Sequence, residues 1–365
     1  MINKQIKLIF IIPSLRAGGA ERVMSFLSQN MNNKTFNSEL VVIEDASKIS
    51  YPIHTNPVTF LGKKKVRYAI PAIISLLHNR KPDIVLSAIS HLNMTMSLLS
   101  IFFPKTIFVG RETIVASVKS KMKKGPRINK ILYALIPKLL DAIICQSEDM
   151  KNDLLKNYGY PEKKLYVINN PVTQKFQLKK SNTSSGQIKQ LITVGRLHKQ
   201  KGYERIISML SELKIPYHYT IIGDGPHWMD VKAAINEKRI SEHITHIPFT
   251  NNVESYLASS DLFLKGSYVE GFPNVLLESC AVGTPVVAYN APGGINEIII
   301  PGLNGEIAEN DIDFLNKVEM CLKKKWDSVK IRNSVLEKFS EEKILKDYEN
   351  LFIELKNSKS LSYHA

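Results

Sequence analysis

QLITVGRLHKQKGYERII, residues 190–207, is the stretch that decides the fold. It reads as a short apolar strand, a loop with glycine and basic residues, and the start of an amphipathic helix. The chain begins with the same order in KLIFIIPSLRAGGAERV, residues 7–23. Because the pattern starts again at mid-chain, the sequence predicts two α/β domains, each a doubly wound, Rossmann-like parallel sheet covered by helices.

Short apolar strands alternate with amphipathic segments in both halves. The expected strands are KLIFII, SELVVIE, DIVLSA, TIFVGRE and DAIICQS in the first half, and QLITVGR, YHYTIIGDG, ITHIPF, DLFLKGS and TPVVAY in the second. A polar segment at 179–190 has the composition of a linker. We therefore expect domains at 1–178 and 188–339, and helices in 340–365 that could pack back onto the first domain. Two such domains facing each other would form a ligand crevice at the carboxyl ends of their strands.

Composition excludes several classes of protein. No run in the 365 residues approaches the roughly 18 to 20 apolar residues that span a bilayer, and the apolar run before Pro13 is shorter than a secretion signal needs. Cys145, Cys280 and Cys321 are far apart and lack metal-ligand spacing. The chain is thus expected to be a cytoplasmic protein without disulfides or a zinc cluster.

Positive charge is concentrated in the first half. Residues 1–180 hold 28 Lys and Arg against 11 Asp and Glu, and the remainder holds 21 against 23. The densest stretch, KSKMKKGPRINK at 119–130, precedes the apolar ILYALIPKLL and contributes Lys119, Lys121, Lys123 and Lys124. Such a combination suits an anionic membrane surface, bound peripherally, and a solvated lysine-rich face is an equally open alternative. Nucleic acid is disfavoured, since no RNA-binding aromatic pattern or zinc finger accompanies the charge.

Glycines and basic residues follow the expected strands. Gly18 and Gly19 precede the first helix, where they permit backbone N–H groups to approach an anion, although a tight turn also needs glycine. Arg196 and Lys201 share the loop after the first strand of the second half, well placed for a diphosphate. The dinucleotide pattern G-x-G-x-x-G is missing, since the segment from Gly223 supplies only G-x-G.

EGFPNVLLES, residues 270–279, places two carboxylates around the start of a helix near Pro273. The first N–H groups of that helix are expected to be free and to bind an anion, namely those of Asn274, Val275 and Leu276. Glu270 could then accept hydrogen bonds from a sugar, and Glu278 from both hydroxyls of a ribose. The alternative is that Glu270 is a solvated loop residue and Glu278 a charge on the helix surface.

EGFPNVLLE resembles the E-x7-E motif of retaining glycosyltransferases of family 4, which have the GT-B architecture. The resemblance extends along the chain through GGAERV, VGRLHKQKG, IIGDGP, GTPVVAYNAPGGINEII and GLNGEI. It implies a nucleotide-sugar donor on the second domain. Arg196 and Lys201 would hold the diphosphate, Glu278 the ribose, Glu270 the donor sugar, and Gly19 the donor from across the cleft.

Two further segments resemble the acceptor side of this family more loosely. SAISHLNMT contributes His91 and Asn93, and VGRETIV contributes Arg111 and Glu112. Many relatives carry a histidine directly after that glutamate, where this chain has Thr113. His91 is therefore the weaker candidate for a catalytic histidine, beside the alternative of a hydrogen-bonded structural residue.

No metal or other cofactor is expected. The DID stretch at 311–313 follows GLNGEIAEN, so Asp311 or Asp313 is expected to cap a helix. The resemblance implies transfer of a sugar, with retention, from a UDP-sugar to a growing bacterial surface glycan. The expectation of a lipid-linked acceptor, at the inner face of the cell membrane, comes from the basic first domain. A nucleotide-sugar epimerase and a non-catalytic partner with the same fold remain alternatives.

Overall fold

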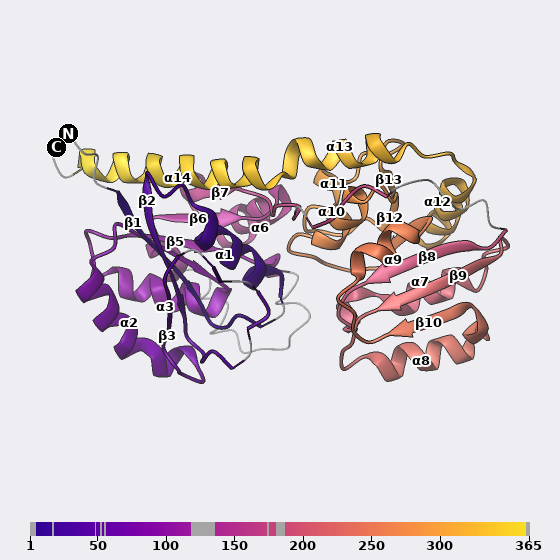
Figure 1. Cartoon of the computed structure of the whole chain (residues 1–365), viewed down its shortest axis with the longest axis horizontal. Coiled ribbons are helices and arrows are strands. Elements are labelled where there is room, and N and C mark those ends of the chain that lie inside the picture. The colour runs from indigo at the N-terminus through magenta and orange to yellow at the C-terminus, as the bar shows by residue number, and fades with distance from the viewer. Residues whose placement is uncertain are drawn as a thin grey trace. The chain divides into compact units, whose positions relative to one another are not determined.

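The computed structural model describes residues 5–16, 18–47, 49–51, 53–54, 56–117, 136–173, 175–179 and 187–362. The chain divides into two compact units (Figure 1). Unit 1 runs to Asn170 and resumes at Glu342, and unit 2 is Pro171–Glu341. Each unit is built around its own parallel sheet, as the alternating pattern predicted.

The sheet of unit 1 has the strand order β3-β2-β1-β4-β5-β6-β7, and its strands pair in parallel. The strands are β1 (Ile6–Ile12), β2 (Phe36–Val42), β3 (Val58–Phe60), β4 (Ile84–Ala88), β5 (Ile107–Arg111), β6 (Ala142–Cys145) and β7 (Leu165–Val167). The strand order reverses between β1 and β4, since β2 and β3 lie on one side of β1 and β4 lies on the other. In an open sheet this switch point leaves a crevice at the carboxyl ends of the strands.

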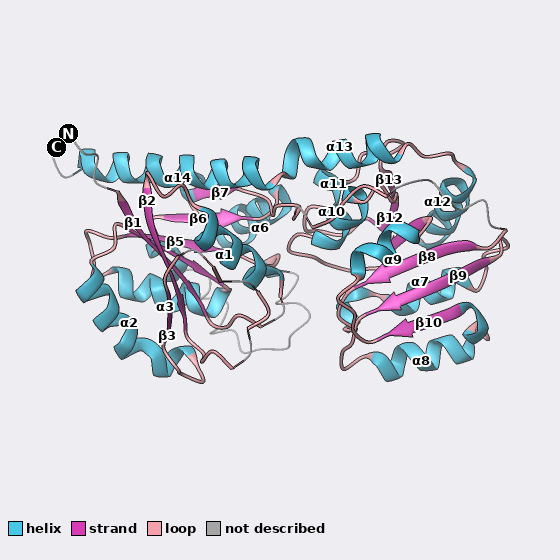
Figure 2. Cartoon of the chain, viewed as in Figure 1, coloured by secondary structure: helices cyan, strands magenta, loops and turns pink. Residues whose placement is uncertain are grey.

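Helices cover both faces of this sheet (Figure 2). The described helices are α1 (Gly19–Asn30), α2 (Val66–Arg80), α3 (Ser90–Ser100), α6 (Glu148–Tyr158) and α14 (Glu341–Ser362), with 3-10 turns η1 (Ile136–Leu139) and η2 (Glu162–Lys164). One core joins the sheet to α1 and to α14, which buries Ile344, Tyr348, Leu351 and Phe352. The last helix of the chain is therefore part of unit 1.

The sheet of unit 2 repeats the topology, with the order β10-β9-β8-β11-β12-β13. Its strands are β8 (Lys189–Val194), β9 (Tyr217–Ile222), β10 (Ile244–Ile247), β11 (Leu262–Lys265), β12 (Val286–Tyr289) and β13 (Gly305–Ala308). All of these neighbours pair in parallel. The switch point lies between β8 and β11.

Successive strand residues of unit 2 point to opposite faces and fill two cores. Leu262 and Leu264 join one core, and Phe263 between them joins the other. The first core is closed by α7 (Tyr203–Leu210), α8 (Trp228–Glu237) and α12 (Asp311–Lys323). The second is closed by α9 (Val253–Ser259), α10 (Asn274–Ala281), α11 (Ile295–Ile298) and α13 (Ser328–Phe339). The 3-10 turns η3 (Lys199–Lys201) and η4 (Ser241–His243) complete the unit.

The boundary between the units lies before residue 171, and not at the polar segment 179–190. Val172 and Phe176 are buried in the second core of unit 2. The N–H of Val172 donates to the carbonyl of Phe339 at 2.8 Å, and that of Lys179 to Val282 at 3.1 Å. Apolar anchoring thus assigns 171–178 to unit 2, because burial of these side chains outweighs the polar composition that follows them.

Candidate functional site

The candidate site in unit 2 lies at the carboxyl ends of β8 and β11, which are neighbours at the switch point. The loop after β8 carries Arg196 and ends in η3 with Lys201, and the loop after β11 carries Ser267 and Glu270. Both are crossover loops at the edge where open α/β sheets bind ligands. The topology therefore brings together residues that are about 70 positions apart in the sequence.

Glu270 is the centre of a buried charge cluster. Its Oε1 lies 2.8 Å from Lys201 Nζ and 2.7 Å from Lys265 Nζ, and it accepts a hydrogen bond from Ser267 Oγ at 2.5 Å. Its Oε2 lies 2.8 Å from Lys201 Nζ. Because two ammonium groups share one carboxylate, the cluster of Lys201, Lys265 and Glu270 carries one net positive charge when all three are ionised.

The two lysines differ in exposure, so they can play different parts. The Lys265 side chain is 4% exposed and that of Lys201 is 20% exposed. Burial lowers the pKa of Lys265 to about 8, although the Glu270 carboxylate opposes the shift. Burial alone would raise the pKa of Glu270, but Lys265 and Lys201 outweigh it and hold that pKa well below its usual range. Lys265 is thus a fixed partner of Glu270, and Lys201 is the ammonium that a ligand can reach.

Glycines allow the loops of the site to pack backbone to backbone. Gly202, at φ +59°, lies so close to the Gly266 carbonyl that a Cβ there would be 2.0 Å from its oxygen. Gly293, at φ +120°, approaches the Glu270 carbonyl in the same way, with a Cβ distance of 2.2 Å. Both positions combine a left-handed backbone with a close approach, so no side chain fits there. The loop that carries Glu270 is held on two sides.

Arg205 on α7 also holds the loop that carries Glu270. Its Nε donates to the Gly266 carbonyl at 2.6 Å, and its Nη2 donates to the Ser267 carbonyl. The guanidinium also stacks over the Tyr268 and Tyr289 rings, at 4.2 and 3.7 Å from their centroids. Sequence reasoning missed Arg205 and Lys265. The signal for Lys265 was a charged residue in the otherwise apolar strand LFLK, which requires a buried counter-ion.

The other residues expected on the donor side differ in exposure and in hydrogen bonding. Arg196 is exposed in the loop after β8, and Glu278 is buried on α10. The expectation of three free N–H groups at the start of α10 was wrong for two of them. The N–H of Asn274 donates to Phe272 and that of Leu276 to Pro273, at 3.0 and 2.9 Å. The tight turn after Phe272 uses these donors itself, and Val275 is partly buried beside them.

Gly223 lies after β9, and its backbone carbonyl accepts a hydrogen bond from His246 Nε2 at 2.8 Å. A Cβ on Gly223 would be 2.1 Å from the Gly195 carbonyl, so this glycine packs the β9 loop against the β8 loop. Its role within unit 2 is to hold the loop that carries Arg196.

The DID stretch begins α12, where Asn310 is the cap in place of either aspartate. The Asn310 side chain accepts from the Asp313 N–H at 3.0 Å. Asp313 pairs with Lys317 at 2.9 Å, and Asp311 accepts from the Tyr289 hydroxyl at 2.8 Å. Across the described parts of the chain, no group of three or more His, Cys, Asp or Glu side chains is arranged to hold a metal ion.

A second polar cluster lies in unit 1 at the carboxyl ends of β4 and β5, which are neighbours in the sheet. Ile89 follows β4 with φ +77°, a conformation that a β-branched residue rarely adopts. It starts α3, so that His91 is exposed and Asn93 is fully buried. Asn93 Nδ2 donates to the Arg111 carbonyl and to Glu112 Oε1, each at 3.0 Å. The strained turn is held in place by hydrogen bonds below it.

Asn93, Arg111 and Glu112 were expected on the acceptor side, and the structure shows all three side chains buried within unit 1. Arg111 is fully buried, its Nε donates to the Tyr348 hydroxyl of α14 at 2.9 Å, and its Nη2 donates to Asn170. Glu112 is 4% exposed and accepts from Ser90 Oγ at 3.0 Å. The side chains of Arg111 and Glu112 are thus buried against α14 and α3. They support the turn that carries His91.

Gly18 and Gly19 begin α1 directly after the loop that follows β1. The Gly18 N–H donates to the Tyr51 hydroxyl at 2.8 Å, and that hydroxyl donates to the Gly18 carbonyl at 2.7 Å. The four lysines proposed to contact a membrane, at 119–124, lie outside the described residues. Within the described ranges, no helix is both long and apolar enough to cross a bilayer.

Two family models match consecutive parts of this chain. The model of glycosyl transferases group 1 matches residues 174–337, and that of Glycosyltransferase Family 4 matches residues 17–175. The two matches follow the division into units, with the Glu270 cluster inside the first model and the Ile89 turn inside the second.

Individual proteins are also similar to this chain, in sequence or in fold. A Campylobacter jejuni N-acetylgalactosamine-N,N'-diacetylbacillosaminyl-diphospho-undecaprenol 4-alpha-N-acetylgalactosaminyltransferase is 28% identical over 341 residues, 90% of this chain and 92% of its own. Among solved structures, Anabaena HepE in complex with UDP has a TM-score of 0.79 at 15% identity, covering 96% of this chain and 100% of that one. The lipopolysaccharide outer core galactosyltransferase WaaB has a TM-score of 0.78 at 20% identity, covering 96% and 99%. These two structural likenesses concern the fold alone.

Proposed function

This chain belongs to the glycosyltransferases that the group 1 and family 4 models describe, with the GT-B fold, and on that premise we propose its donor, acceptor and mechanism. The proposed reaction moves a sugar from a UDP-sugar to a lipid-linked or growing bacterial surface glycan, with retention of configuration. The site is expected at the inner face of the cell membrane.

The observation that carries the donor proposal is the Glu270 cluster. A nucleoside diphosphate needs positive charge at its phosphates and hydrogen-bond acceptors at its sugars. Unit 2 supplies Lys201 and the exposed Arg196 in one loop, and Glu270 and Glu278 on the neighbouring loop and helix. Because the cluster is positively charged before any ligand binds, the site is prepared for an anion without a metal ion.

The structure suggests how Lys201 could serve both Glu270 and a diphosphate. Lys201 reaches both oxygens of Glu270, and Lys265 lies 2.7 Å from Oε1. When Lys201 turns to a phosphate, Lys265 and Ser267 keep the carboxylate ionised and in place, and Oε2 becomes available to a sugar hydroxyl. Lys265 thereby removes the penalty of leaving a buried carboxylate without a cation.

The relatives support the donor and the acceptor separately. HepE structures hold UDP, UDP with glucose, and UDP-glucose. The name of the Campylobacter jejuni relative specifies an acceptor linked to diphospho-undecaprenol. In the proposed mechanism, Arg196 and Lys201 stabilise the leaving diphosphate, and the acceptor attacks from the same face with a donor phosphate oxygen as base. Catalysis then depends on positioning and electrostatics.

Mass spectrometry of products from a panel of nucleotide sugars and undecaprenyl-diphosphate-linked acceptors tests the proposal. Transfer is expected with a UDP-sugar, and proton NMR of the product should show the anomeric configuration of the donor. A donor-only reaction separates transfer from epimerisation. Inverted product, or transfer from another class of nucleotide only, would refute the corresponding part of the proposal.

A further inference from the structure

Large apolar side chains are exposed on the outer surface of α2 and α3 in unit 1. Phe102 is 74% exposed and Ile101 is 61% exposed, both directly after α3. Three more exposed apolar side chains lie on the helices themselves, Tyr68 and Ile74 on α2 and Leu98 on α3. Since α2 contacts α3 and Figure 1 shows the two side by side, we name these five residues and the basic residues around them the α2/α3 surface.

The same part of the chain is almost free of acidic residues. Between residues 46 and 111, Asp83 is the only acid, against nine Lys and Arg. Asp83 is already paired with Lys356 at 2.5 Å. Lys81 and Lys105 are exposed at one end of the α2/α3 surface, and the exposed run of lysines at 63–65 precedes α2 at the other. The apolar side chains are thus framed by positive charge.

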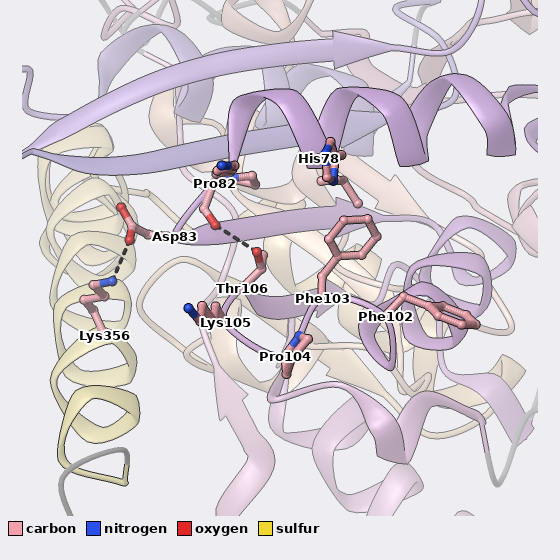
Figure 3. A pocket seen from close by; sticks show the side chains of 11 residues that line it. His78, Pro82, Asp83, Phe102, Phe103, Pro104, Lys105, Thr106 and Lys356 are labelled. Atoms are coloured by element: carbon pink, nitrogen blue, oxygen red, sulfur yellow. Dashed lines mark hydrogen bonds and ion pairs between the residues drawn. The ribbon is translucent and has the colours of Figure 1, made fainter.

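A recess of about 650 Å³ opens beside Phe102. Figure 3 shows His78, Phe102, Phe103 and Lys105 around it, with Asp83 and Lys356 joined on its far side. The recess lies at the amino ends of β4 and β5, since Asp83 precedes β4 and Thr106 precedes β5. The Ile89 turn follows the carboxyl end of β4, so the recess and the turn lie at opposite ends of the strands. A partner that filled the recess would leave the turn open.

We propose that the α2/α3 surface docks unit 1 on a membrane that contains anionic lipid. Apolar patches on a soluble surface mark interaction sites, and aromatic and aliphatic side chains among lysines are typical of segments that lie in the lipid interface. A second copy of the chain fits poorly, because two surfaces with the same excess of positive charge repel each other. The inference rests on the proposed function in one respect: the lipid-linked acceptor proposed above would lie in the membrane on which unit 1 docks.

Co-sedimentation with phosphatidylcholine vesicles, with and without phosphatidylglycerol, tests the docking surface. The parent chain is expected to bind the anionic vesicles and to be released by salt. Ile101→Ser with Phe102→Ser should weaken vesicle binding at least about tenfold, because the exposed hydrocarbon is lost. Lys81→Asn with Lys105→Gln should weaken it by about tenfold and reduce its salt dependence. Asparagine suits position 81, where φ is +48°.

Matched controls lie on unit 2. Phe249 is 77% exposed, so Phe249→Ser removes a comparable apolar side chain, and Lys232→Gln with Lys238→Gln removes two exposed cations from the α8 region. Both controls are expected to bind vesicles as the parent does. The inference is overturned if the α2/α3 variants also bind as the parent does, if neutral vesicles bind equally well, or if the protein without vesicles sediments as a dimer that Phe102→Ser abolishes.

UDP binding, measured by calorimetry without vesicles, keeps the two proposals apart. The α2/α3 variants are expected to bind UDP with the affinity of the parent, since no residue of the Glu270 cluster is changed. A parent chain that fails to bind UDP refutes the proposed donor and leaves the vesicle result standing. A parent that binds UDP but no anionic vesicles refutes the docking surface alone.

Discussion

Lys265→Met is the most informative change to the Glu270 cluster. The side chain is 4% exposed, and burial lowers its pKa from 10.5 to about 8. Between pH 8 and pH 10.5 the unfolded chain holds a proton that the folded protein has released. The contribution of Lys265 to the free energy of unfolding of the parent should therefore rise with pH across this window, by roughly 3 kcal/mol in all. The Met variant lacks the group, so it should lack this rise.

The measurement is urea unfolding of parent and variant at several pH values, read as the difference between the two curves. At pH 7 the variant should be at least as stable as the parent, because Lys201 still neutralises Glu270 and a methionine avoids the desolvation of an ammonium. Lys317→Met, which removes one ammonium from the Asp313 pair on α12, is the matched control. A parent–variant difference that stays flat or falls from pH 8 to 10.5 would refute the reasoning.

Three further predictions test the site and its support. Lys201→Ala and Glu278→Ala should each lower kcat/KM at least about tenfold, the effect of losing one charged hydrogen bond of roughly 1.5 to 3 kcal/mol. The far-UV circular dichroism of both variants should be unchanged. Full activity in both would remove the donor-site assignment. Treatment with a chelator should leave transfer largely intact, since the positive charge belongs to the protein, and loss of activity with rescue by manganese would contradict this. Tyr348→Phe should lower the free energy of unfolding by about 1 to 3 kcal/mol, because the buried Nε of Arg111 loses its acceptor, and an unchanged denaturation midpoint would show that the bond contributes nothing.

Much of the fold was predictable because strand and helix signals are local. All ten expected apolar runs contain strands of the two sheets, since a buried parallel strand needs a continuous apolar stretch. The strands that were not expected are the short ones at the edges, β3, β7 and β13, with three or four residues each. VTF and LYV have only three residues each, and GEIA contains a glycine and a glutamate, so none of these segments has a continuous apolar run of four residues.

The sequence alone determined that Arg196, Lys201, Glu270 and Glu278 belong to loops and helix starts that follow strands. It could not determine which charges meet. Lys265 reads as part of a strand, and only the pairing of β11 with β8 brings it and Lys201 onto one carboxylate. Likewise, the contact between Arg111 and Tyr348 joins residues 237 positions apart. Strand position depends on local side-chain chemistry, whereas ion pairs between strands depend on the order of the strands in the sheet, and that order is fixed by packing of the whole unit.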